Sequence, residues 1–152
     1  MPSPISPSAR RSVELPTLLA SLLDAEYGLY RTFSAILGCF AVPLPPTLRR
    51  LLDGQKRESD DRLMRLAAEI GMHGGSARIQ SGPKPIDPVA GLAGLRALQH
   101  TLIARLQAAI ASGLDVRNED TPAGLFSDMR AGHLRAAAGL RAYHEGTVVP
   151  AA

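Results

Sequence analysis

The sequence predicts an all-α domain, a bundle of four long helices, and three observations support this fold class. Apolar residues make up 45% of the chain and aromatic residues only 4%, so the core has to be built mainly from leucine, alanine and isoleucine. Leucine and alanine favour helices, whereas the β-branched and aromatic residues that favour strands are scarce. The 12 prolines leave four long proline-free windows, as four uninterrupted helices require.

Length, charge and cysteine content narrow the class of protein further. With 152 residues the chain fits one domain that buries a real core. The net charge of +3 is spread along the sequence, and Arg10 and Arg11 alone give little grip on phosphates, so we expect no nucleic-acid partner. Cys39 is the single cysteine, and no apolar stretch reaches the ~18 residues of a membrane span. We therefore expect a cytoplasmic protein without a membrane partner.

The first two proline-free windows predict one helical hairpin. The first helix is expected to begin at Pro16 and to run to about Cys39, with large apolar residues at helical spacing. The second helix is expected to start near Thr47 as N-cap and to stop before Gly74-Gly75. Because the connection between them is short, the two helices should be antiparallel.

The last two windows predict a second hairpin of the same kind. The third helix is expected to open at Asp87-Pro88, a cap followed by a proline in the first turn, and to end at Gly113. The fourth helix repeats that opening with Thr121-Pro122 and is expected to end at Gly146. The connection between these two helices is also short.

The segments outside the helices predict the topology and the domain limits. The linker from about Gly74 to Ile86 has 13 residues. At ~3.3 Å per residue it reaches ~43 Å, more than the ~37 Å height of a 25-residue helix. It predicts two hairpins joined by a long crossover, with a plain up-down-up-down bundle as the alternative. We expect a disordered tail at residues 1–13, the bundle at 14–146 and a C-terminal tail at 147–152.

Polar residues interrupt the apolar stripe near the middle of every helix. Glu26 does so in the first helix, Gln99 in the third and His133 in the fourth. The second helix has eight consecutive polar positions at residues 55–62, so at least one must face inward. The inward-facing side chains are expected among Gln55, Glu58, Ser59 and Arg62. A buried carboxylate is costly unless it is paired or bound to metal, so a functional polar cluster is predicted; the alternative is a partly hydrated polar core.

From Leu15 to His144 the sequence resembles the ferritin-like superfamily, which includes ferritins, bacterioferritins and the Dps proteins. The order of the helices, the long crossover and the mid-helix polar groups carry the resemblance. The Gly74-Gly75 after the second helix is similar to the pair that closes that helix in many members. The resemblance implies a homo-oligomer that handles iron, or another divalent metal, by binding, Fe(II) oxidation or storage.

The metal ligands are implied by the di-iron pattern of that family. The pattern has Glu on the first helix, Glu-x-x-His on the second, Glu on the third and Glu-x-x-His on the fourth. Matching it residue by residue gives the candidate metal ligands Glu26, Glu58, Asp61 and His133. Mixed carboxylate and imidazole ligands suit iron, manganese or zinc.

Two positions depart from the pattern and leave the function open. Gln99 replaces the glutamate of the third helix, with His100 beside it, and Arg130 replaces the glutamate of the fourth. A guanidinium keeps its charge at ordinary pH, and one alternative is that it pairs with Glu26 or Glu58 in place of a metal. The site is then a metal site, a metal-free salt-bridged cluster, or no cluster at all.

These alternatives lead to competing hypotheses of function. The first is a ferritin-like iron-handling protein, in which ferroxidase activity stays undecided. The second is a non-catalytic, metal-free bundle of the same ancestry, a structural or stress-related interaction module. A haemerythrin-like di-iron bundle would need paired histidines, which the four histidines here do not form. The inter-subunit site of Dps proteins is not predicted either, because Met64 and Ala68 stand at its positions.

Overall fold

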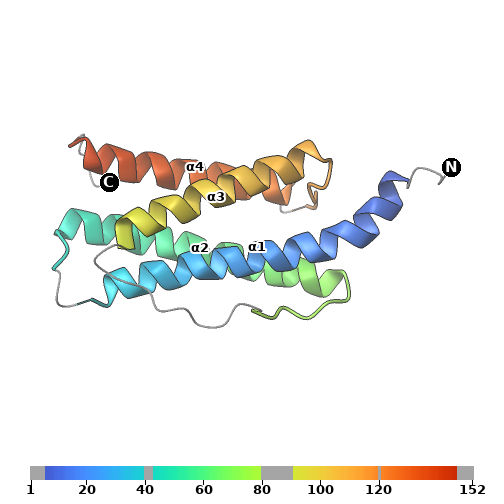
Figure 1. Cartoon of the computed structure of the whole chain (residues 1–152), viewed down its shortest axis with the longest axis horizontal. Coiled ribbons are helices and arrows are strands. Elements are labelled where there is room, and N and C mark those ends of the chain that lie inside the picture. The colour runs from blue at the N-terminus through green and yellow to red at the C-terminus, as the bar shows by residue number, and fades with distance from the viewer. Residues whose placement is uncertain (1–5, 40–42, 80–90, 120, 147–152) are drawn as a thin grey trace.

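The computed structural model of the chain (Figure 1) describes residues 6–39, 43–79, 91–119 and 121–146. Within these residues the chain forms helices and no strand, which confirms the predicted all-α class. The four helices are α1 (Pro7–Leu37), α2 (Pro46–Met72), α3 (Gly91–Ala111) and α4 (Leu125–His144).

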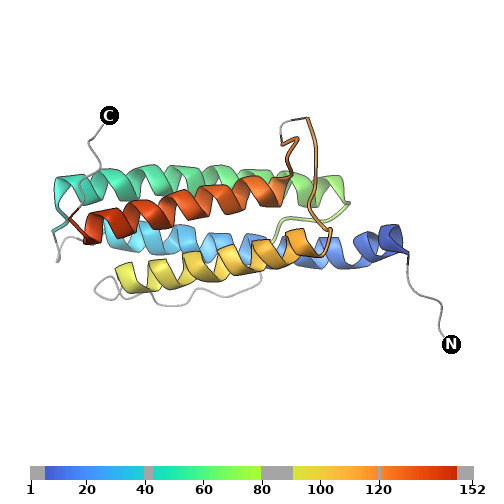
Figure 2. The ribbon, with the colours of Figure 1, turned by 90° about the horizontal axis from the view of Figure 1, so that it is seen from above.

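The helices form a four-helix bundle in which each helix packs against two others. α1 packs against α2 and α3, and α4 packs against α3 and α2. α2 and α3 therefore lie on one diagonal of the bundle, and α1 and α4 on the other. Figures 1 and 2 show that α2 and α3 run in the same direction, each antiparallel to the helix that precedes or follows it in its hairpin. The end of α2 and the beginning of α3 accordingly lie at opposite ends of the bundle.

α1 is longer than predicted at its N-terminal end. It begins at Pro7 rather than at Pro16, and Pro16 lies inside the helix. Proline has no amide hydrogen and is most easily accommodated in a first turn, which made Pro16 resemble a start. The helix continues through it and extends beyond its neighbours (Figure 1). Part of the tail predicted at residues 1–13 is thus helical, and residues 1–5 lie outside the described residues.

α2 begins and ends close to the predicted residues. Pro46 is its first residue and Pro45 takes the N-cap position, so the predicted N-cap at Thr47 is wrong. The end agrees with the prediction, because Gly74 adopts a left-handed φ of 78° that other residues adopt at a cost. Its neighbour Gly75 donates its amide hydrogen to the carbonyl oxygen of Ile70 at 3.0 Å, which satisfies one of the free carbonyls of the last turn.

α3 is described from Gly91 onward, so the predicted opening at Asp87-Pro88 lies outside the described residues. The close packing of α3 on α1 requires a glycine at its start. A Cβ atom at position 91 would lie 2.5 Å from Cγ1 of Ile36. The helix ends at Ala111, and Gly113 follows with a φ of 72°, as the sequence predicts for a helix terminus.

α4 begins later than predicted, because its N-terminus is capped by a residue from the preceding loop. The helix starts at Leu125 rather than at Thr121-Pro122. The carboxylate of Asp115 accepts hydrogen bonds from the backbone amides of Phe126 at 2.7 Å and Ser127 at 3.3 Å. A carboxylate at this place satisfies free amides and complements the positive end of the helix dipole.

Leucine builds most of the core, as the composition predicts. The largest of the almost completely buried side chains are Leu19, Leu22, Leu29, Phe33, Leu52, Leu66, Leu95, Leu102, Leu106, Leu125, Phe126 and Met129. Burial of each such side chain contributes roughly 1.5–3 kcal/mol before the entropy of ordering it is subtracted. In the part of the chain that the structure describes, no helix has both the length and the apolar character needed to cross a membrane.

Candidate functional site

A layer of buried polar side chains crosses the bundle at mid-height, and all four helices contribute to it. We call this set the polar layer, and each member is at most 5% exposed. Its members are Glu26 from α1, Gln55, Ser59 and Arg62 from α2, Gln99 from α3 and His133 from α4. The prediction of polar groups facing inward at this height is therefore confirmed for every helix.

Glu26 is the centre of the polar layer and both of its carboxylate oxygens are occupied. Oε1 accepts a hydrogen bond from the hydroxyl of Ser59 at 2.8 Å and another from Nε of Arg62 at 2.8 Å. Oε2 lies 2.8 Å from Nε2 of His133, a geometry in which the ring donates its Nε2 hydrogen to the carboxylate. The first hairpin thus supplies two of the three partners, and the second hairpin supplies the third.

The partners of Glu26 keep its carboxylate ionised inside the bundle. Burial of the side chain raises the pKa of Glu26, because a charged group loses its hydration. The hydrogen bond and charge of His133 and those of Arg62 outweigh burial, and they hold the pKa of Glu26 below its ordinary value. Glu26 is 0% exposed, so its charge is stabilised by these neighbours and not by water.

Arg62 reaches from α2 into the seam between α2 and α4. Its side chain is 4% exposed, and its Nη1 lies 4.0 Å from Oε2 of Glu58, one helical turn earlier. Gly132 of α4 leaves room for the guanidinium, because a Cβ atom at that position would lie 3.2 Å from Nη1 of Arg62. The glycine therefore allows a long cationic side chain to lie flat against the backbone of α4.

Two glutamines continue the polar layer beside the carboxylate cluster. Nε2 of Gln99 donates to Oε1 of Gln55 at 3.2 Å, and Nε2 of Gln55 donates to the carbonyl oxygen of Ala136 at 3.1 Å. These bonds join α3 to α2 and α2 to α4. The glutamines thus connect the two hairpins through uncharged hydrogen bonds, next to the charged cluster of Glu26 and Arg62.

Three buried atoms have no hydrogen-bond partner among the residues that the structure describes. They are Oε1 of Gln99, Nδ1 of His133 and Nε of Arg130. A buried polar atom without a partner costs about 1–3 kcal/mol. Two of the three atoms belong to the polar layer. The layer therefore includes groups whose burial lowers the free energy of unfolding, beside the hydrogen bonds that hold the helices in register.

The structure brings together two of the four predicted metal ligands. Glu26 and His133 meet in the polar layer, as described above. The side chain of Glu58 is 54% exposed, and Asp61 lies exposed on the outside of α2. Gln55, Ser59 and Arg62 occupy the inner face of α2, which leaves Glu58 and Asp61 on its solvent side. Within the described residues, no group of three or more His, Cys, Asp or Glu side chains is arranged to hold a metal ion.

The donor set of the polar layer does not fit a resident pair of metal ions. A divalent cation needs several free lone pairs from carboxylates or unprotonated rings, and these have to converge on one point. Here both oxygens of Glu26 already accept hydrogen bonds, and a permanently charged guanidinium stands beside them. A cation at Glu26 would have to displace Arg62 from its contact.

The arginine that pairs with the carboxylate is Arg62. The sequence leaves open a pair of Arg130 with Glu26 or Glu58, but Arg130 forms no ion pair within the described part of the chain. Arg62 takes that place, and it had been included among the inward candidates of the polar run. The guanidinium that pairs with Glu26 is therefore that of Arg62 and not that of Arg130.

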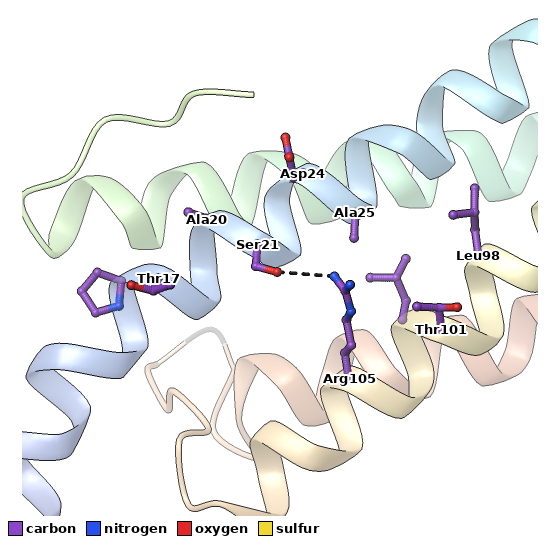
Figure 3. A pocket seen from close by; sticks show the side chains of 10 residues that line it. Thr17, Ala20, Ser21, Asp24, Ala25, Leu98, Thr101 and Arg105 are labelled. Atoms are coloured by element: carbon purple, nitrogen blue, oxygen red, sulfur yellow. Dashed lines mark hydrogen bonds between the residues drawn. The ribbon is translucent and has the colours of Figure 1, made fainter. Parts of the chain in front are cut away.

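A surface cavity between α1 and α3 is separate from the polar layer. Figure 3 shows this cavity of about 760 Å³, across which Nη1 of Arg105 donates to the hydroxyl of Ser21 at 3.4 Å. A second cavity of about 660 Å³ shares Thr17, Ser21 and Arg105 with it. The space arises because α1 presents small side chains toward α3 here. Neither lining contains a histidine or a cysteine.

Comparison with known proteins does not add a relative to this description. The chain matches no protein-family model, no curated protein and no solved structure. Membership of the ferritin-like superfamily therefore stays a prediction. The geometry of the polar layer is the basis on which a function can be proposed.

Proposed function

We propose that the chain is a metal-free four-helix bundle of ferritin-like ancestry that acts as a structural or stress-related interaction module. In this proposal the ion pair between Glu26 and Arg62 stands where a metal would be held in an iron-handling relative. The protein then has no ferroxidase activity, and its helices serve to present surfaces to other molecules.

The single observation that carries the proposal is the saturation of the Glu26 carboxylate by protein donors. Ser59, Arg62 and His133 all lie 2.8 Å from its two oxygens. A charge-assisted hydrogen bond from arginine to carboxylate is short and strong, and here it is shielded from water. The positive charge that neutralises Glu26 is already part of the chain, so no cation is needed to make its burial tolerable.

The direction of the helices supports the ancestry in the proposal. α2 and α3 run in the same direction and lie on a diagonal (Figures 1 and 2). Because α2 and α3 follow one another in the chain and run in the same direction, the segment between them has to return along the whole bundle. The linker of 13 residues is long enough for this. The proposed topology is accordingly two antiparallel hairpins joined by a long crossover, as in ferritins.

The proposal is tested by metal analysis of the full chain purified without chelators, followed by anaerobic titration with Fe(II), Mn(II) or Zn(II). We expect no ion above background and no change in Tm on adding a chelator or a metal. The matched control is Asp60→Ala, which removes an exposed carboxylate of α2 that is not a candidate ligand and should behave like the wild type.

The opposite result would support the alternative function, a ferritin-like protein that handles iron. About one or two ions per chain, lost in Glu26→Ala and kept in Asp60→Ala, would overturn the metal-free proposal. Binding would then require Arg62 to move away from Glu26. Fe(II) oxidation by the wild type at a rate above that of Glu26→Ala would extend this conclusion to ferroxidase activity.

A further inference from the structure

The two cavities between α1 and α3 form one continuous groove on the surface of the bundle. They share the lining residues Thr17, Ser21 and Arg105, so the cavity of about 760 Å³ continues into the cavity of about 660 Å³. Each volume lies within the range of about 300–1,000 Å³ that is usual for small-molecule sites. We call this space the Arg105 groove, after the residue at its middle.

The Arg105 groove is open because α1 and α3 diverge along their length. They approach closely at the start of α3, where a Cβ atom on Gly91 would lie 2.5 Å from Cγ1 of Ile36. From there the two helices separate toward the end of α3 (Figure 1). Ala20, Ala25 and Ala108 line the space between them, and their side chains are too short to fill it. The groove therefore follows from the packing of two helices and not from the position of a loop.

Arg105 places a positive charge in the middle of the groove. Its side chain extends from α3 toward α1 (Figure 3), and Nη1 donates to the hydroxyl of Ser21 at 3.4 Å. This bond is longer than the roughly 2.7–3.2 Å that is usual between nitrogen and oxygen. In the part of the chain that the structure describes, Arg105 forms no ion pair, and Asp24 points away from it (Figure 3). The guanidinium is therefore available to an anion from outside the chain.

On one side of Arg105 the walls of the groove are mostly apolar. The apolar residues that line the smaller cavity there are Leu18, Ala108, Ala109 and Leu114. Glu14, an acidic residue of the same lining, stands seven residues before Ser21, which is about 10 Å along α1 at 1.5 Å per residue. Apolar walls favour an aliphatic group, because contact removes apolar surface from water on both sides.

We propose that the Arg105 groove binds a small amphipathic carboxylate, a single aliphatic chain with one carboxylate at its end. The carboxylate accepts charge-assisted hydrogen bonds from the guanidinium of Arg105, which gives up its long bond to Ser21. The hydroxyl of Ser21, released from Arg105, becomes a donor to the same carboxylate. The aliphatic chain lies along the apolar side of the groove, between Leu18 and Ala108.

The charge of the groove favours a carboxylate over a phosphate. Arg105 is the one cationic side chain that lines either cavity, and it matches a single negative charge. A phosphate monoester carries between one and a half and two charges at neutral pH, roughly twice what one guanidinium neutralises. The proposal goes beyond the proposed function, because the groove contains no member of the polar layer. It holds whether the polar layer binds a metal or not.

The proposal is tested by titration of the full chain with decanoate, followed by amide NMR spectra. Two further probes separate the parts of the ligand: decanol has the chain without the charge, and acetate has the charge without the chain. We expect saturable binding of one decanoate per chain, with a Kd about tenfold or more below that of either other probe. The shifted amides should belong to the residues of α1 and α3 that line the groove.

Two variants test the two halves of the groove separately. Arg105→Gln removes the charge, so it should raise the Kd of decanoate about tenfold and leave that of decanol unchanged. Ala108→Phe fills the apolar side, so it should raise the Kd of both probes. The matched control is Arg96→Gln, because Arg96 lies two and a half turns before Arg105, at about 3.6 residues per turn, and so on the opposite face of α3. Circular dichroism checks that each variant is folded.

Four results would overturn the proposal. Decanoate that fails to saturate the wild type at millimolar concentration would remove the site. Equal affinity for decanoate and decanol, or an unchanged Kd in Arg105→Gln, would show that the guanidinium does not bind the carboxylate. Shifts centred outside α1 and α3 would place the ligand elsewhere. Sedimentation of the wild type with phosphatidylglycerol vesicles, lost in Arg105→Gln, would assign the groove to a membrane surface in place of a single small molecule.

Discussion

The polar layer at mid-height and the leucine layers above and below it both exclude water, but they specify the bundle in different ways. Leucines such as Leu52 and Leu66 flank the layer on α2 and are fully buried. Their attraction is non-directional and scales with the apolar area removed from water. Glu26, by contrast, needs donors at 2.8 Å from particular atoms of Ser59, Arg62 and His133.

The two kinds of layer therefore have different roles in folding. The leucine layers supply most of the stabilisation and tolerate exchange among side chains of similar volume. The polar layer contributes less net stability, because desolvation of its charges offsets most of their attraction. The polar layer instead disfavours other packings of the helices, because any packing that leaves a buried polar side chain without its hydrogen-bond partner costs free energy.

The largest effect is expected when the polar layer loses its cation. Arg62→Leu leaves the carboxylate of Glu26 buried without its guanidinium, which should lower the free energy of unfolding by about 3–5 kcal/mol. Urea denaturation followed by circular dichroism measures this loss. Arg141→Leu, which removes an exposed arginine of α4, should change the free energy of unfolding by less than about 0.5 kcal/mol.

The same loss should be largely reversible by removing the carboxylate as well. The double variant Glu26→Leu/Arg62→Leu replaces the ion pair by apolar groups and should be more stable than Arg62→Leu alone. A double variant as unstable as the single one would show that Arg62 acts by packing and not by charge. The comparison between the two layers would then lose its basis.

The second effect concerns a leucine layer. Leu66 is fully buried, and Leu66→Ala should lower the free energy of unfolding by about 2–5 kcal/mol through lost burial and a cavity. Leu66→Met keeps the volume and should cost less than about 1.5 kcal/mol. If Leu66→Met lowered the free energy of unfolding as much as Leu66→Ala, the leucine layers would depend on the shape of each side chain as well as on its volume. The contrast with the polar layer would then be weakened.

The third effect is the pH dependence of stability that Glu26 produces. Arg62 and His133 lower the folded-state pKa of Glu26, so its contribution is fully present above the ordinary pKa of 4.5. The contribution should disappear as the pH falls from there through the lower folded-state pKa. We expect the free energy of unfolding of the wild type to fall more steeply below about pH 4.5 than that of Glu26→Gln. Parallel curves from urea denaturation at each pH would contradict this.

The smallest effect is expected at the end of the bundle, where water can replace lost contacts. Asp115 caps α4 through the amides of Phe126 and Ser127. Asp115→Ala should therefore cost about 1 kcal/mol in thermal or urea unfolding. Glu119→Ala, an exposed change in the same loop, serves as control. A loss of free energy of unfolding as large as that of Arg62→Leu would mean that polar contacts at the ends of the bundle contribute as much to stability as those at mid-height.

The sequence predicted the fold and most of the polar layer, because both depend on periodicity. Leucine spacing and proline-free windows predicted four helices, and the polar interruptions predicted Glu26, Gln99 and His133 as inward residues. Each stands seven residues from apolar neighbours, and seven residues nearly complete two turns of a helix.

The sequence could not predict which members of the polar run on α2 face inward. All eight residues from Gln55 to Arg62 are polar, so the run contains no apolar residue that would show which face of the helix is buried. Gln55, Ser59 and Arg62 face inward as considered, but Glu58 does not. Glu26 pairs with Arg62 and not with Arg130, and Nη1 of Arg62 lies close to Gly132 of α4, a contact that depends on how two helices pack. The cap at Asp115 was missed because it lies outside the usual position before the helix.

The polar layer also has a consequence for the order in which the bundle assembles. Ser59 and Arg62 are 33 and 36 residues from Glu26 along the chain, whereas His133 is 107 residues away. Short loops close sooner than long ones, so we expect the pair between Glu26 and Arg62 to form within the first hairpin, while water still surrounds it. In this order, packing of the second hairpin would then remove that water and bring the imidazole of His133 to Glu26. A slow step in refolding would accordingly correspond to the drying of an ion pair that already exists.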